Sequence, residues 1–149
     1  MRARRVNAGV VCGVVGWTGR EPSTILRPMD RPRDNALDLP LDPDEWEVTS
    51  RELKRRLDAG QSIVLLDVRE PMELEICRLP GSVHIPLLDL PSRRGEIEPS
   101  GDLVVFCHHG IRSYQATAYL RGMGRPRVWN LSGGIHEWAL RIDPELRLY

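Results

Sequence analysis

Short apolar runs and segments of helical pattern alternate along most of the chain. Three continuous apolar runs, at residues 63–68, 103–106 and 128–131, are typical of strands that are buried on both faces. A further short strand is predicted at 82–85, after the Pro80-Gly81 turn. Because strands alternate with helical segments, the pattern predicts an α/β protein with a mainly parallel central sheet and helices on both faces.

The predicted helices begin and end at residues that are common at helix termini. Thr49 or Ser50 is a suitable N-cap for the first helix, and Gly60 ends it. The remaining helical segments are expected at 71–77, 87–90, 113–120 and 135–140, with a polar loop at 93–102. Regular structure is therefore expected from about Glu47 onward.

The first part of the chain lacks this periodicity. Residues 1–45 are rich in Pro, Gly, Arg and Asp, and we expect a flexible N-terminal extension followed by one domain over 46–149. The apolar run at 10–17 follows several arginines, as in a secretory signal, but glycines interrupt it and no clear cleavage site follows. We therefore expect a cytoplasmic protein, with Met29 as an alternative start.

Charge and cysteine content exclude several classes of function. The 21 basic and 21 acidic residues give a net charge of zero, so we expect no nucleic-acid partner. No run approaches the roughly 20 apolar residues of a membrane span, so no membrane partner is expected either. The three cysteines are odd in number and irregularly spaced, which argues against a disulfide framework.

Candidate chemistry lies where the buried strand at 103–106 ends. The strand leads into Cys107, a short loop follows, and a helix begins directly after it. The helix N-terminus, inward N–H groups in a loop that Gly110 allows to curl, and the cation of Arg112 should together favour the Cys107 thiolate. They should also stabilise an anion bonded to the sulfur. In parallel sheets, ligands bind outside the carboxyl ends of the strands, which is where Cys107 lies.

These residues resemble the rhodanese family. The match is Cys107-x-x-Gly110-x-Arg112-Ser113, and it is supported by residues 66–70 (LDVRE), 79–86 (LPGSVHIP) and 130–138 (NLSGGIHEW). The resemblance covers about residues 47–140 and implies a five-stranded rhodanese-like fold. It also implies that Cys107 accepts sulfane sulfur from a donor such as thiosulfate, forms a persulfide, and passes the sulfur to cyanide or a thiol. No cofactor is expected.

The resemblance leaves two other classes of function open. Many rhodanese-like domains pass sulfur to a dedicated protein acceptor, and some only bind partners; the retained Cys107 argues against the inactive kind. Related phosphatases have one more residue between the cysteine and the arginine. Here four residues separate Cys107 from Arg112, and this tighter loop argues against a phosphatase.

Within the predicted loop, Arg112 is expected either to bind the donor anion or to tie the loop to a nearby carboxylate. Ser113 is expected to act as a helix cap rather than as a catalytic hydroxyl. His108 and His109 are expected to be wall residues with exposed rings. The predicted loop that binds donor and persulfide comprises His108, His109, Gly110, Ile111, Arg112 and Ser113.

Three residues outside the loop complete the prediction. By resemblance, Asp67 lies near the loop and accepts hydrogen bonds that fix its geometry, and Arg69 is structural. Cys77 is expected to be a packed thiol, with a second sulfur relay as the alternative. No metal site is expected from Cys107, His108 and His109, because adjacent residues rarely converge on one ion.

Overall fold

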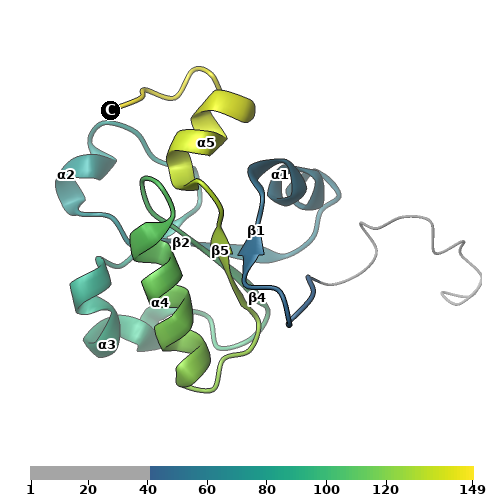
Figure 1. Cartoon of the computed structure of the whole chain (residues 1–149). Coiled ribbons are helices and arrows are strands. Elements are labelled where there is room, and N and C mark those ends of the chain that lie inside the picture. Colours follow the sequence, from purple (N-terminus) through teal and green to yellow (C-terminus); the bar gives the residue numbers. More distant parts are fainter. Residues whose placement is uncertain (1–40) are drawn as a thin grey trace, which may run out of the picture. The chain divides into compact units, whose positions relative to one another are not determined.

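A five-stranded parallel sheet forms the centre of the computed structural model, which describes residues 41–149 (Figure 1). Its strand order is β1-β5-β4-β2-β3, and every neighbouring pair is parallel. The strands are β1 (Glu47–Val48), β2 (Ile63–Asp67), β3 (Val83–His84), β4 (Asp102–Phe106) and β5 (Val128–Leu131). The predicted α/β class is confirmed, with β1 as the edge strand that joins the four predicted from sequence.

Helices cover both faces of this sheet (Figure 1). Helices α1 and α5 lie on one face, whereas α3 and α4 lie on the other. Within residues 41–149, no helix has both the length and the apolar character needed to cross a membrane. The helices are α1 (Ser50–Asp58), α2 (Pro71–Leu74), α3 (Leu90–Arg93), α4 (Ile111–Gly122) and α5 (Gly134–Arg141), with short 3₁₀ segments η2 (Leu87–Asp89) and η3 (Arg94–Glu96).

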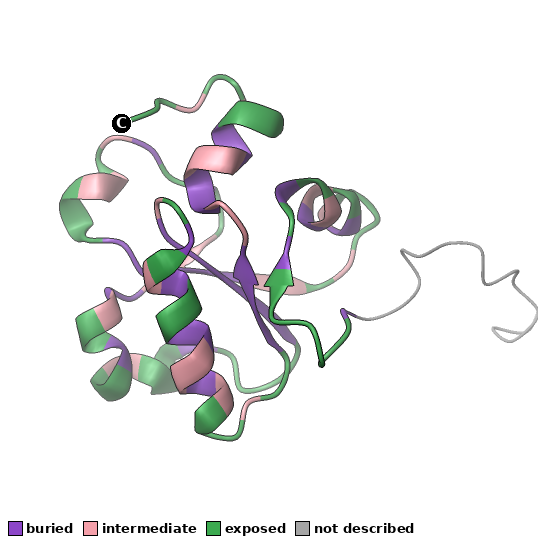
Figure 2. Ribbon diagram, viewed as in Figure 1, coloured by how far each residue is buried: buried purple, intermediate pink, exposed green. Residues whose placement is uncertain are grey.

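Strand β4 divides its side chains between the two apolar layers. Val104 and Phe106 pack with α1 and α5, whereas Leu103 and Val105 pack on the face that α4 covers. This alternation is the two-residue period of an extended strand. It continues into Cys107, which lies in the same layer as α4 and is only 2% exposed. Figure 2 shows the buried residues concentrated on the central strands and on the inner sides of α4 and α5.

The packed unit begins earlier than the sequence predicts. Leu41 is buried in the apolar layer beneath α1 and α5, and the indole N–H of Trp129 donates to the Asp42 carbonyl at 2.8 Å. Residues 41–45, predicted to be part of a flexible extension, are therefore anchored to the sheet. The Pro and Asp content of this segment is typical of a flexible linker. The contact with Trp129 could not be predicted, because Trp129 is distant in sequence. The rest of the predicted extension, residues 1–40, lies outside the described part.

Candidate active site

The loop between β4 and α4 and the first turn of α4 direct two hydrogen-bond donors at the sulfur of Cys107. The Gly110 N–H donates to Cys107 Sγ at 3.1 Å, and the Ser113 hydroxyl donates at 3.4 Å. Gly110 adopts a left-handed backbone with φ of +100°, which other residues rarely adopt. Its conformation lets the chain fold back, so that its N–H points at the sulfur.

Ser113 does not have the capping role that the sequence predicts. Helix α4 starts at Ile111 and its N-cap is Gly110, so Ser113 lies inside the first turn, fully buried. The helix begins earlier than expected because the glycine ends the loop in a conformation that places Ile111 directly in the helix. The Ser113 hydroxyl is thereby turned toward Cys107 rather than toward the helix backbone.

The N-terminus of α5 supports the other side of this loop. The Ile135 N–H donates to the Cys107 carbonyl at 2.9 Å, and the His136 N–H donates to the His108 carbonyl at 3.1 Å. A Cβ atom at Gly134 would lie 2.4 Å from each of these two carbonyl oxygens. The Gly133-Gly134 pair, predicted only as a turn, thus allows α5 to approach the loop closely enough to bind its carbonyl groups.

Arg112 forms a two-pronged ion pair with Glu73 of α2. Its Nη1 and Nη2 atoms donate to the two carboxylate oxygens of Glu73 at 2.6 and 2.7 Å. This bonding lowers the pKa of Glu73 to about 2, and the same contact raises the pKa of Arg112. The sequence left two roles open for Arg112, and the structure shows the bond to a carboxylate, that of Glu73. It fixes the guanidinium at the end of the loop.

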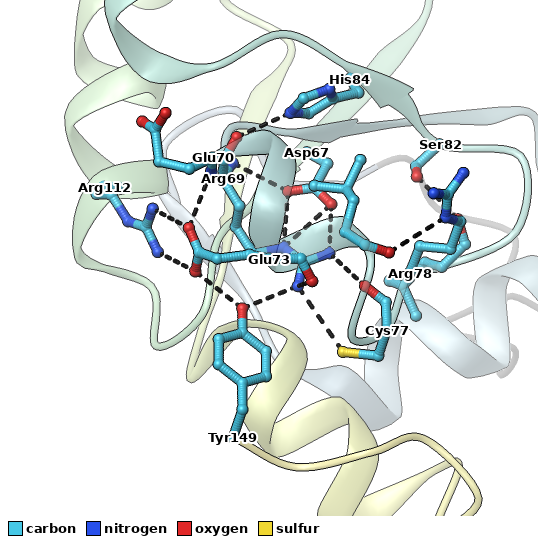
Figure 3. Close-up of polar contacts among 12 residues, drawn as sticks. Asp67, Arg69, Glu70, Glu73, Cys77, Arg78, Ser82, His84, Arg112 and Tyr149 are labelled. Atoms are coloured by element: carbon cyan, nitrogen blue, oxygen red, sulfur yellow. Dashed lines mark hydrogen bonds and ion pairs between the residues drawn. The ribbon is translucent and has the colours of Figure 1, made fainter.

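Asp67 and Arg69 form a fully buried ion pair at the end of β2 (Figure 3). The Asp67 carboxylate accepts hydrogen bonds from the backbone N–H of Arg69 at 3.0 Å and from its Nε at 2.9 Å and Nη2 at 2.6 Å. These contacts fit the structural role expected of Arg69. The prediction for Asp67 was wrong in detail, because its carboxylate holds Arg69 rather than the N–H groups of the 107–113 loop.

Tyr149 connects the buried pair to the rim of the site (Figure 3). Its hydroxyl accepts from Arg69 Nη1 at 2.9 Å and donates to Glu73 Oε1 at 2.8 Å, while its ring stacks on His108 at 4.0 Å. Burial raises the pKa of Tyr149 to about 12, so the hydroxyl remains a donor at neutral pH. Neither Glu73 nor Tyr149 could be predicted as a site residue from the sequence, because no local pattern links either residue to Arg112.

The two histidines of the loop differ in exposure. His109 is exposed as predicted, but His108 is half-buried beneath stacked rings, so the expected exposed ring is wrong for His108. A hollow of about 440 Å³ opens beside the loop and is lined by His109, Gly110 and Ile111 together with Tyr114. The hollow gives a small molecule space next to the loop.

Cys77 lies in a packed environment that differs from the Cys107 loop. It is 9% exposed, and its sulfur accepts a long contact of 3.8 Å from Arg69 Nη1. Its backbone carbonyl accepts from Arg69 Nη2 at 2.9 Å. Cys77 therefore has the packed surroundings expected of a structural thiol.

The ion pair between Glu73 and Arg112 predicts a pH-dependent contribution to stability. The pKa of Glu73 falls from 4.5 to about 2 on folding, so the contribution is present above pH 4.5 and is lost as the pH falls toward 2. At pH 7 we expect Glu73→Gln to lower the free energy of unfolding by about 1–2 kcal/mol. The difference from wild type should shrink below pH 4.5 and vanish near pH 2 in urea unfolding curves.

A matched control is Glu96→Gln, which removes a carboxylate from an exposed pair with Arg93. Solvent screens that pair, so we expect little change in the free energy of unfolding. A difference between wild type and Glu73→Gln that stays constant from pH 7 to 2 would contradict the assigned pKa shift.

The geometry is that of a strand–loop–helix cradle around a cysteine sulfur, and comparisons with known proteins identify its family. The Rhodanese-like domain family matches residues 49–141. The chain belongs to the rhodanese-like domain family.

Two relatives of this chain are named as proteins that transfer or carry sulfur. A protein named sulfurtransferase from Allochromatium vinosum is 41% identical over 93 residues, which cover 62% of this chain and 87% of the relative. The putative sulfur carrier protein YrkF from Bacillus subtilis is 32% identical over 110 residues, covering 74% of this chain but 56% of YrkF. These relatives support a sulfurtransferase.

Solved structures agree with this family. A rhodanese-related protein from Thermoplasma volcanium has a TM-score of 0.60 and 29% identity, covering 65% of this chain and 93% of that one. The human single-domain sulfurtransferase TSTD1 has a TM-score of 0.56 and 30% identity, covering 64% of this chain and 96% of that one. The predicted rhodanese-like fold is confirmed.

Proposed function

We propose that this protein is a sulfurtransferase that carries sulfane sulfur as a persulfide on Cys107. One observation carries the proposal: the Gly110 N–H and the Ser113 hydroxyl both point at Cys107 Sγ, at 3.1 and 3.4 Å. Donors directed at a sulfur stabilise its anionic form, whether thiolate or persulfide. The start of α4 adds the partial positive charge of a helix N-terminus.

The reaction then proceeds in two displacements. The Cys107 thiolate attacks the outer sulfur of a donor such as thiosulfate; a new S–S bond forms, the old one breaks, and sulfite leaves with its electron pair. An acceptor, cyanide or a thiolate, next attacks the terminal sulfur of the persulfide. The Cys107 thiolate is released, and ping-pong kinetics follow.

Arg112 is the residue that we propose binds the anionic donor. Its guanidinium is 32% exposed, and Glu73 occupies only one N–H of each terminal nitrogen. The remaining N–H donors are available to a sulfonate group. Glu73 and Tyr149 would hold the guanidinium in place while the donor binds.

A second candidate function is that of a sulfur carrier with a dedicated protein acceptor. Ile111 and Tyr114 line the hollow beside the loop, and their side chains are 73% and 45% exposed. Such exposed apolar surface suits a protein partner.

The proposed chemistry also bears on the location of the protein. Because sulfur transfer needs a free thiol, and Cys77 and Cys107 are free, we propose a reducing, cytoplasmic location.

Intact-mass spectrometry tests the proposal directly. After incubation with thiosulfate, the reduced protein should gain the mass of one sulfur atom, and cyanide should remove it as thiocyanate. Absence of a gain from thiosulfate, together with a gain from a persulfide donor, would favour the carrier function. Hydrolysis of an aryl phosphate without any sulfur gain would contradict both and indicate a phosphatase.

A further inference from the structure

Three of the four histidines in the chain converge beside the Cys107 loop. His108 and His109 follow Cys107 in the loop, whereas His136 comes from the first turn of α5. One ring nitrogen of each residue belongs to a set in which all atoms lie within 4.8 Å of one another. The rings of His109 and His136 are 4.8 Å apart between centroids, and those of His108 and His109 are 3.9 Å apart.

Two ring nitrogens in this cluster have no hydrogen-bond partner among the described residues. They are His108 Nε2 and His136 Nδ1, and both atoms are buried. Burying a polar atom without a hydrogen-bond partner costs free energy, so a ligand that bonds these two nitrogens would stabilise the folded protein.

The surrounding structure positions the His108 ring and the backbone of His136. The backbone hydrogen bond from the His136 N–H to the His108 carbonyl, at 3.1 Å, joins α5 to the loop. The Tyr149 ring stacks on His108 with an interplanar angle of 13°. His109 is exposed and can rotate toward the other two. The cluster is thus preorganised at two positions and adjustable at the third.

We propose that His108, His109 and His136 form a binding site for a divalent transition-metal ion of the Zn²⁺ class. Imidazole nitrogens suit such ions, whereas Mg²⁺ and Ca²⁺ prefer oxygen ligands. Ligand nitrogens around tetrahedral Zn²⁺ lie about 3.4 Å apart, a spacing that rotation of the exposed His109 ring can approach. Three protein ligands leave a fourth position for water or a small anion.

The site is separate from the sulfur of Cys107. That sulfur is turned into the loop, toward Gly110 and Ser113, and it is not part of the cluster of ring nitrogens. No metal was expected from sequence because Cys107, His108 and His109 are adjacent. The fold adds His136 from α5, which lies 27 residues beyond His109 in the sequence.

Zn²⁺ titration of the full chain, followed by isothermal calorimetry, tests the proposal. Wild type should bind one Zn²⁺, and His109→Gln and His136→Gln should each weaken binding by more than about tenfold. His84→Gln is the matched control, because His84 lies outside the cluster and its Nε2 contacts the Arg69 carbonyl. It should bind Zn²⁺ as wild type does, and so should Cys107→Ser.

Visible absorption of bound Co²⁺ gives a second readout that does not depend on activity. Wild type and Cys107→Ser should show the same tetrahedral spectrum, without the near-ultraviolet band of a thiolate–cobalt bond. Unchanged Zn²⁺ affinity in both His109→Gln and His136→Gln would overturn the site. Loss of binding in Cys107→Ser would overturn the assignment of three imidazole ligands. Circular dichroism of each variant confirms that it is folded before titration.

Discussion

Replacing Cys107 with serine is expected to abolish sulfur loading while the domain stays folded. The serine hydroxyl is close in size to the thiol and can accept the same hydrogen bonds from Gly110 and Ser113. However, a hydroxyl is scarcely ionised at neutral pH and is a far weaker nucleophile toward sulfur than a thiolate. Intact-mass spectra after incubation with thiosulfate should show no added sulfur, and thiocyanate production should fall to background.

Cys77→Ser is the matched control for this experiment. Cys77 is also buried and free, but its sulfur contacts Arg69, whereas that of Cys107 accepts from the Gly110 N–H and the Ser113 hydroxyl. We expect this variant to gain one sulfur atom and to release it to cyanide as wild type does. Sulfur gain that persists in Cys107→Ser and disappears in Cys77→Ser would transfer the nucleophilic role to Cys77.

Replacing Asp67 with asparagine is expected to cause the largest loss of stability among these variants. Asp67 and Arg69 are both 0% exposed, and the carboxylate is the counter-charge of the guanidinium. Removing one partner of a buried ion pair leaves the other charge uncompensated, which costs about 3–5 kcal/mol. The free energy of unfolding from urea titration at pH 7 should fall by that amount.

Glu96→Gln, in the exposed pair with Arg93, is the control for loss of a carboxylate and should behave nearly as wild type. The Asp67 substitution should also slow sulfur transfer, because Arg69 holds Tyr149, and Tyr149 bonds Glu73, the partner of Arg112. If Asp67→Asn proves no less stable than Glu96→Gln, then Arg69 finds other compensation and the ion pair is not the main support of the site.

Much of the site is local in sequence, which explains why it could be predicted. The strand at 103–106, the cysteine that follows it and the glycine that curls the loop are consecutive, so their arrangement depends on backbone preferences of a few residues. The role of Ser113 and the exposure of His108 were harder to predict from the sequence. The start of a helix can move by a residue or two without a change in pattern, and the exposure of a ring depends on what stacks over it.

The chain by itself determined the α/β class, the place of Cys107 at the end of a buried strand, and the candidate nucleophile. Only the tertiary structure decided that Arg112 pairs with Glu73 across 39 positions of sequence and that Tyr149 joins Arg69 to Glu73. It alone brought His136 to the loop histidines. Backbone periodicity is encoded within a few neighbouring residues, whereas the meeting of distant side chains depends on how helices pack on the sheet.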